Sequence, residues 1–390
     1  MKRTIPPHRD EPNGILQLMK YQVIIIAFLV LAGCQHTKKE TKQANSPYSF
    51  YVGTYTDTKS EGIYKYLLQK DGHLKPIGLA AKSVNPSFLA MSDDQRFLLA
   101  VNEIINDEDV GTLESFSVSD DSLSFISRSI TGGAHPCFVS LNQFGYVLTA
   151  NYTGGNVGLL KLSKNGELSE LLDIQQHKGS GISERQEAPH AHSAWFGTDA
   201  NAVISVDLGT NELWFSQLDT VMNKLQATEP YKLEMAAAAG PRHLVFHPNN
   251  KWIYVLNELD CTVTLVEKMD QSKYQKKLSY SSLPQAYNES NTAADIHISS
   301  DGKFVYASNR GHNSIAIYGV NPLDGSLNLI AHESTLGKGP RNFTLSPDEN
   351  YLLVANQYTN NIVSFKRDKS TGMLNYVDQT DAPTPVCILF

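Results

Sequence analysis

The side chains best suited to chemistry are one imidazole, one carboxylate and three guanidinium groups: His192, Glu258, Arg242, Arg310 and Arg341. A guanidinium binds a carboxylate or a phosphate through paired hydrogen bonds, and it stays charged at any ordinary pH. An imidazole or a carboxylate can take a proton from water within hydrogen-bonding reach. Gathered in one place, these side chains would bind a small anionic ligand.

These residues occupy matched places in repeating units. Six units end an apolar run in Asn or Asp, at Asn102, Asn151, Asp207, Asn257, Asn309 and Asn356, and Gly53 takes that place in a seventh. Just after this mark the units read Thr54, Glu103, Tyr152, Leu208, Glu258, Arg310 and Gln357. Just after an earlier Pro or Ala they read Ser87, Cys137, His192, Arg242, Ala294, Arg341 and Val386. A purely structural repeat needs no charge in these two columns. The alternative is that the charged side chains form surface ion pairs or join adjacent units.

The repeat predicts the elements that position the two columns. Successive marks lie 47 to 56 residues apart, and each unit contains four short β signals separated by turn residues. Four antiparallel strands in about fifty residues make one propeller blade. The sequence therefore predicts an all-β, seven-bladed β-propeller over residues 48–390. A string of separate small β domains is the alternative, but fifty residues cannot bury an adequate core alone.

The first unit lacks the strand that begins the others, and residues 385–390 match that missing strand. We expect the carboxyl-terminal strand to pair beside Tyr51 and to close the ring, since closure removes both exposed edges.

The longest spacing between successive marks is the 56 residues from Asn151 to Asp207, and this unit carries an extra loop over residues 176–190. Long loops on rigid scaffolds often carry function. His190 and His192 stand at its end, two apart, and would share one face of a strand. No third metal ligand follows at a suggestive spacing, so we expect neither a metal nor another cofactor. His190, His243, Arg341 and Gln357 are candidate substrate contacts.

Three further residues have structural interpretations. His247 is expected to make a turn contact, His297 to be a hydrogen-bonded structural histidine, and Asp295 to pair with a neighbouring Arg. Cys137, Cys261 and Cys387 show no paired spacing and are expected to be small buried hydrophobes.

The amino end predicts export. An apolar stretch over residues 23–32 has the length of a signal-peptide core, and it is followed by Gly33-Cys34. Leu31-Ala32-Gly33-Cys34 resembles a bacterial lipobox, in which Cys34 becomes lipid-modified. Residues 1–34 are thus a candidate signal peptide, whose true start could be Met19, and residues 35–47 a polar tether. This predicts a lipid-anchored protein of the bacterial cell envelope facing the periplasm, with no other membrane contact. Without a functional signal, the protein would be cytoplasmic.

The net charge of −7 and the lack of a basic run argue against nucleic acid as a partner. Charged residues at 19% and hydrophobic residues at 41% are typical of a soluble globular body.

Several motifs recur in the order typical of one family. They include Gly240-Pro241-Arg242-His243, Asn257-Glu258-Leu259, Ala294-Asp295-Ile296-His297, Ser308-Asn309-Arg310, Pro189-His190-Ala191-His192 and Asp207-Leu208-Gly209. From about residue 48 to 390 the chain resembles the lactonase-type seven-bladed propellers. That family includes bacterial propeller 6-phosphogluconolactonases and fungal carboxy-muconate cyclases.

The resemblance implies metal-free chemistry on a lactone at one mouth of the channel. In the cyclase branch the proposed catalytic set is one His, two Arg and one Glu, which here match His192, Arg242, Arg310 and Glu258. The family's usual cytoplasmic members lack a lipobox, and this chain departs from them there.

The residues also support a chemical hypothesis of their own. Glu258 or His192 would take a proton from water, and Arg242 would stabilise the oxyanion. Arg310 or Arg341 would hold a distant phosphate or carboxylate.

The leading function is therefore a 6-phosphogluconolactonase-like lactone hydrolase acting on a small anionic lactone or sugar-acid substrate. One alternative is a muconate-type lactonizing enzyme, and another is a non-catalytic, lipid-anchored binding propeller.

Overall fold

The computed structural model describes residues 1, 4, 47–57, 59–120, 122–199, 201–270 and 273–390. Residues 47–390 form one compact unit. Apart from residues 1 and 4, the predicted signal peptide lies outside the described residues, and so do the lipobox at Cys34 and the tether up to residue 46. Within the described part of the chain, no helix is both long enough and apolar enough to cross a membrane.

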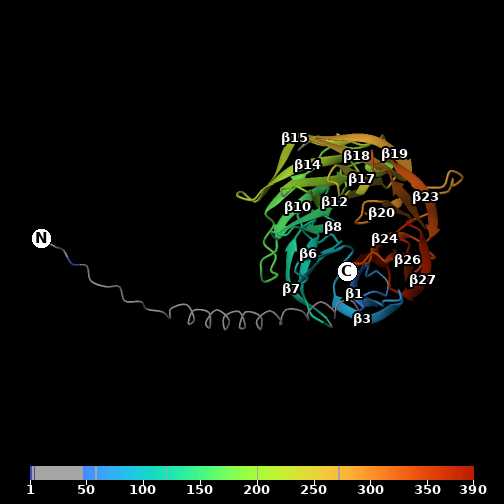
Figure 1. Cartoon of the computed structure of the whole chain (residues 1–390), viewed down its shortest axis with the longest axis horizontal. Coiled ribbons are helices and arrows are strands. Elements are labelled where there is room, and N and C mark those ends of the chain that lie inside the picture. The colour runs from blue at the N-terminus through green and yellow to red at the C-terminus, as the bar shows by residue number, and fades with distance from the viewer. Residues whose placement is uncertain (2–3, 5–46, 58, 121, 200, 271–272) are drawn as a thin grey trace. The chain divides into compact units, whose positions relative to one another are not determined.

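Seven separate four-stranded antiparallel sheets are arranged around a common centre (Figure 1). The first blade contains β28 (Pro385–Leu389), β1 (Tyr48–Thr54), β2 (Gly62–Leu68) and β3 (Leu74–Lys82). The second contains β4 (Leu89–Met91), β5 (Phe97–Asn102), β6 (Thr112–Val118) and β7 (Leu123–Ile130). The third contains β8 (Pro136–Leu141), β9 (Tyr146–Asn151), β10 (Asn156–Lys161) and β11 (Asp173–Gln176).

The fourth blade contains β12 (Ala191–Phe196), β13 (Ala202–Asp207), β14 (Glu212–Asp219) and β15 (Lys224–Glu234). The fifth contains β16 (Pro241–Phe246), β17 (Trp252–Asn257), β18 (Thr262–Asp270) and β19 (Lys273–Ser281). The sixth contains β20 (Ala293–Ile298), β21 (Phe304–Asn309), β22 (Ser314–Val320) and β23 (Leu327–Ser334). The seventh contains β24 (Pro340–Leu345), β25 (Tyr351–Asn356), β26 (Asn361–Arg367) and β27 (Leu374–Asp381). One short 3₁₀ helix, η2 (Glu184–Gln186), lies between the third and fourth blades. The predicted all-β, seven-bladed fold is confirmed.

Packing between neighbouring blades builds the core. Every residue of the second strands β5, β9, β13, β17, β21 and β25 is buried. These strands are covered on both faces by adjacent blades, so their sequences are near-continuous apolar runs rather than alternating ones. For example, Phe304 and Tyr306 of β21 pack in one cluster with Leu352 and Val354 of β25.

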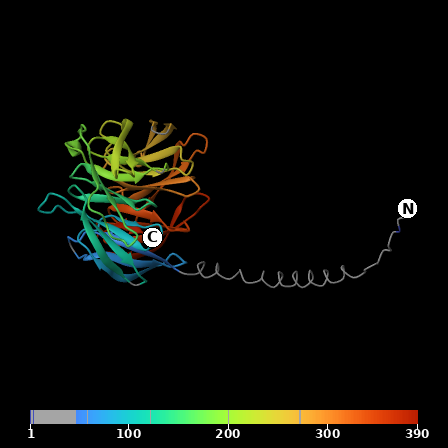
Figure 2. The same cartoon turned by 90° about the vertical axis from the view of Figure 1, so that its left-hand side faces the viewer.

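The first strands of the blades line the centre and contact one another in turn around the ring, from β4 through β28 and back to β4. As predicted, the carboxyl-terminal strand closes the ring: Tyr51, Val52 and Gly53 of β1 pair with residues of β28. Figures 1 and 2 both show the carboxyl end within the propeller, by the first blade.

A β-bulge near the start of the first strand accounts for one of the two columns. In the fifth blade Pro241 pairs with Asn257, but His243 pairs with Leu256, so Arg242 is left out of the ladder. The same shift leaves out Cys137, His192, Arg341 and Val386 in their own blades. A bulge re-aims the extra residue, so the fold repeatedly turns this side chain out of the regular pleat.

One prediction about the first blade is wrong by one residue. Thr54, not Gly53, pairs with Pro385, as Asn151 pairs with Pro136. The next amide, that of Tyr55, bonds to Thr384 O, just as the Glu258 amide bonds to Gly240 O. The second column therefore contains Tyr55 where the sequence analysis placed Thr54. Thr54 instead donates its hydroxyl to Gly62 O within the blade.

Candidate functional site

The two columns meet at one mouth of the channel, and residues from all seven blades contribute. The mouth cluster, as we call it, consists of Tyr55, Glu103, Cys137, Tyr152, His192, Arg242, Glu258, Arg310 and Arg341, together with Arg185 from η2. It holds four guanidinium groups and two carboxylates. Two positive charges therefore lack a carboxylate inside the cluster.

Glu258 is the centre of the cluster. Its Oε2 atom lies 3.0 Å from Arg242 Nε and 2.9 Å from Arg310 Nη2. Its Oε1 atom accepts a hydrogen bond of 3.1 Å from Arg185 Nη2. Three of the predicted site residues thus form one ion-paired group.

The charge state of Glu258 follows from these neighbours. Burial alone would raise the pKa of this carboxyl, but Arg310 and then Arg242 lower it to about 2. Glu258 is therefore ionised across the physiological range and has little affinity for a further proton. Its position favours a role in holding guanidinium groups over a role as a general base.

Arg242 is buried inside the cluster. Its Nη1 atom donates to Ala294 O of the neighbouring blade. Burial, with Arg341 and Arg310 nearby, lowers the pKa of Arg242 to about 10. Its Nε atom forms the ion pair with Glu258 without a hydrogen-bond geometry. Arg310 Nε is likewise buried without a hydrogen-bond partner among the described residues. Buried donors of this kind are costly unless a ligand or solvent satisfies them.

His192 lies beside this ion-paired group, with its Nε2 atom 3.9 Å from Glu258 Oε2. Burial, Arg242, His243 and Arg341 hold the pKa of His192 well below its usual range, so the imidazole is neutral. Its Nδ1 atom is 3.6 Å from Cys137 Sγ. That sulfur is also 3.5 Å from His192 O, an acceptor for its S–H.

Cys137 is buried, as predicted, but its sulfur also makes polar contacts with His192. Burial raises the pKa of its thiol, so it stays protonated. With the S–H directed to a carbonyl, the sulfur can accept a hydrogen bond from His192 when the proton of the neutral imidazole is on Nδ1. In that tautomer the Nε2 atom, on the side of Glu258, carries the lone pair. Cys261 and Cys387 are buried and unpaired, as expected.

Arg341 forms the other side of the cluster. Its Nη2 atom donates to the Tyr55 hydroxyl over 2.8 Å, and that hydroxyl donates to Glu103 Oε2 over 2.8 Å. Although burial opposes the charge, Tyr55 and Glu103 raise the pKa of Arg341. Tyr55 is a residue that the sequence analysis missed, because the one-residue error in the first blade hid it.

The other candidate substrate contacts, His190, Gln357 and His243, differ in whether the described residues already give them hydrogen-bond partners. The His190 ring stacks on Tyr152 at 4.4 Å, and its Nδ1 atom is 3.1 Å from Tyr152 O. Gln357 Oε1 is buried without a partner among the described residues. His243 Nδ1 bonds to Asp295 Oδ1 over 2.8 Å, and its ring lies against Phe88 and Phe138. These contacts give His243 a partner within the core.

Asp295 corrects another expectation, since it bonds to histidines instead of an Arg. Its Oδ1 accepts from His243, and its Oδ2 lies 3.1 Å from His297 Nε2 and 2.6 Å from Asn342 Nδ2. His297 is therefore the hydrogen-bonded structural histidine that the sequence predicts. The turn contact of His247 is confirmed by its Nε2 at 3.1 Å from Gly302 O. Within the described part of the chain, no three His, Cys, Asp or Glu side chains converge as metal ligands do.

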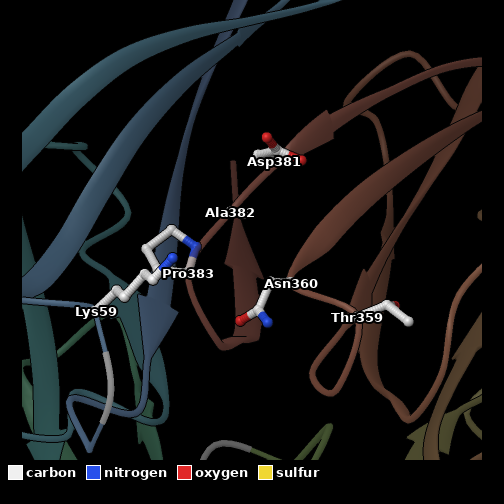
Figure 3. A pocket seen from close by; sticks show the side chains of 6 residues that line it. All are labelled: Lys59, Thr359, Asn360, Asp381, Ala382 and Pro383. Carbon is white, nitrogen blue, oxygen red and sulfur yellow. The ribbon is translucent and has the colours of Figure 1, made fainter.

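A separate hollow of about 610 Å³ shares no lining residue with the cluster. It is lined by Lys59, Thr359, Asn360, Asp381, Ala382 and Pro383 (Figure 3). None of these belongs to the mouth cluster, and Asn360 Oδ1 is already bonded to the Thr384 amide at 2.8 Å. The convergent charged groups favour the mouth over this hollow.

Comparison with known proteins matches the same part of the chain. Residues 49–390 match the family described as "Lactonase, 7-bladed beta-propeller". This chain is a member of that family.

Relatives of the lactonase propeller span nearly its whole folded part. It is 37% identical over 350 residues to a 6-phosphogluconolactonase of Bacillus subtilis, covering 88% of this chain and 98% of that protein. A putative 6-phosphogluconolactonase from Bacteroides fragilis has 32% identity and a TM-score of 0.83, covering 90% of this chain and 99% of that one. A periplasmic gluconolactonase of Pseudomonas aeruginosa has 30% identity and a TM-score of 0.84, covering 88% and 98%.

Proposed function

We propose that this lactonase propeller hydrolyses a sugar lactone to its open-chain acid at the mouth cluster. The observation that carries the proposal is the neutral His192 beside an ionised Glu258 that holds Arg242 and Arg310. The family match and the relatives named as lactonases support the same reaction class.

The chemistry follows from the charge states. In the tautomer protonated at Nδ1, His192 has a free lone pair on Nε2, and this atom accepts a proton as water attacks the lactone carbonyl carbon. The carbonyl oxygen becomes an oxyanion, and Arg242 and Arg310 stabilise it more strongly than they stabilise the ground-state carbonyl. The ring C–O bond then breaks, and the protonated His192 returns its proton to the leaving oxygen. The product is a hydroxy acid.

Glu258 has two functions in this scheme. It holds both guanidinium groups in place, and its negative charge stabilises the imidazolium that forms transiently 3.9 Å away.

The substrate in this proposal is anionic. Four guanidinium groups face two carboxylates in the cluster, so a phosphate or a carboxylate on the substrate would restore the balance. Arg341 is suited to bind that group, since the Tyr55 hydroxyl stands between its guanidinium and the carboxylate of Glu103.

The direct test uses purified residues 47–390. The protein would be assayed with 6-phosphogluconolactone, gluconolactone and a muconolactone, each corrected for spontaneous hydrolysis. Acceleration of the sugar lactones supports the proposal. Acceleration of the muconolactone alone would favour the lactonizing reaction, and acceleration of none would favour a binding protein.

We also propose that the protein is anchored by lipid at Cys34 and works in the periplasm. The lipobox-like Leu31-Ala32-Gly33-Cys34 and the apolar stretch before it support this location. The relative in Pseudomonas aeruginosa is named a periplasmic gluconolactonase. Incorporation of labelled fatty acid by the full chain, and its loss in Cys34→Ser, is the expected result. Equal labelling of both would contradict the anchor.

A further inference from the structure

Arg185 reaches the mouth cluster from outside the two columns. It lies in η2, within the long connection between β11 and β12. Its side chain is 49% exposed, whereas those of Arg242 and Arg310 are 3% and 11% exposed. A ligand that arrives from solvent therefore meets Arg185 before the other two.

The connection that carries Arg185 is fixed to the fourth blade at three points. The buried His177 bonds to Asp207 Oδ2 at 2.7 Å and stacks on Trp214. Gln186 donates to Leu208 O over 2.8 Å. The His190 amide donates to Asp207 Oδ1 over 2.8 Å.

The short helix itself is capped. Ser183 and Gln186 form a capping box, in which each side chain bonds to the other's backbone. The backbone of Arg185 is thus held in place, while its side chain remains at the surface of the mouth.

The guanidinium of Arg185 has unused donors. An Arg side chain carries five N–H donors in a planar fork. The hydrogen bonds that the described residues make with it use Nη2 alone, which donates to Tyr152 OH at 2.9 Å and to Glu258 Oε1 at 3.1 Å. The rest of the fork can bind a second oxyanion.

Glu258 can release Arg185 at little cost. Arg242 and Arg310 both contact the other carboxylate oxygen, Oε2. When Arg185 turns to another anion, Glu258 therefore keeps two cations. Arg242 and Arg310 have no such freedom, because they are buried and their ion pairs within the described residues are with Glu258 alone.

We propose that Arg185 binds the anionic group of the substrate, a phosphate or a carboxylate distant from the lactone ring. Arg185 exchanges Glu258 Oε1 for this group, and so selects charged over uncharged lactones. This inference rests on the proposed lactone hydrolysis, and it adds Arg185 to Arg341 as a second cation for the substrate's anionic group.

The test compares Arg185→Gln with Arg185→Lys and with Lys178→Gln, an exposed cation of the same connection. Each is assayed with 6-phosphogluconolactone, a carboxylated muconolactone and uncharged gluconolactone. Loss of a charge-assisted contact predicts that R185Q lowers kcat/KM for its charged substrate by about 10- to 100-fold, chiefly through KM. The ratio of charged to uncharged kcat/KM should fall by a similar factor.

R185K should restore part of this ratio, and K178Q should keep the wild-type ratio. Which charged lactone loses more tells whether the group bound is a phosphate or a carboxylate. An unchanged ratio in R185Q, or an equal loss in K178Q, would overturn the role of Arg185. If the wild-type protein accelerates no lactone, the proposed function fails, and this inference fails with it.

Discussion

The Nε2 atom of His192 lies 3.9 Å from Oε2 of Glu258, yet the two side chains do not neutralise each other. Glu258 is ionised because Arg310 and Arg242 outweigh its burial. His192 is neutral because burial and Arg242 oppose its protonation. A charged carboxylate and a free imidazole base are thus kept side by side, as general-base hydrolysis requires.

Removing the imidazole should therefore abolish most of the activity without unfolding the protein. We expect His192→Gln to lower kcat by about 10²- to 10⁴-fold, the usual contribution of a general base. Steady-state assays on a sugar lactone would measure it, with circular dichroism to check the fold. A kcat within a few-fold of wild type would show that His192 is not the base.

The pH dependence should report His192 and not Glu258. Since the pKa of His192 is lowered from 6.5, the neutral base persists as the pH falls, and kcat/KM should decline only below that value. The pKa of Glu258, about 2, lies outside the working range. Arg341 is one cation that lowers the pKa of His192, so Arg341→Gln should move the acid limb to higher pH. Profiles of kcat/KM from about pH 4 to pH 8 would test this, and a limb that stays in place or moves down would contradict it.

Tyr55 should act as a positioning residue through Arg341. Its hydroxyl bonds to both Arg341 and Glu103. We expect Tyr55→Phe to raise KM for an anionic lactone by about tenfold, because a hydrogen bond to a charged group is lost, and to change kcat little. The exposed Tyr358 provides the control Tyr358→Phe, which should leave KM unchanged. Equal KM values in the two variants would show that Tyr55 does not position Arg341 for the substrate.

Ring closure by β28 should dominate stability. Ile388 is 4% exposed and packs with Phe50 and Leu353. We expect Ile388→Ala to lower the free energy of unfolding by about 2–5 kcal/mol. Ile182→Ala, the same change at an 80% exposed site, should change it by less than about 0.5 kcal/mol. Urea unfolding would measure both, and similar values would argue against closure by this strand.

The repeat predicted the ring and much of the mouth cluster, because both depend on periodic signals. Apolar runs that end in Asn identify the buried second strand of a blade. The residue after that Asn therefore falls at the mouth in every unit. Glu258 and Arg310 were found in this way, and His192 and Arg242 were found from the residue after the earlier Pro or Ala mark.

The errors have local physical causes. In the first blade Thr54 takes the place that Asn or Asp has in the other blades, so Tyr55 was missed. The bulges at His192 and Arg242 change the side to which a residue points, which a period of two cannot show. Arg185 lies in the extra loop and received no role from the sequence, because this connection is aperiodic and contributes to neither column, although Ser183 and Gln186 have the spacing of a capping box. The burial of Cys137 was predicted, but its contact with His192 depends on two blades meeting.

The central claim is that the mouth cluster stabilises the oxyanion of lactone hydrolysis, and Arg242 tests it most directly. The measurement is kcat for a sugar lactone in Arg242→Ala against wild type, corrected for spontaneous hydrolysis. Because a buried donor to an oxyanion contributes about 10²- to 10³-fold, we predict a loss of at least that size in a protein that remains folded. A folded variant with wild-type kcat would contradict the claim.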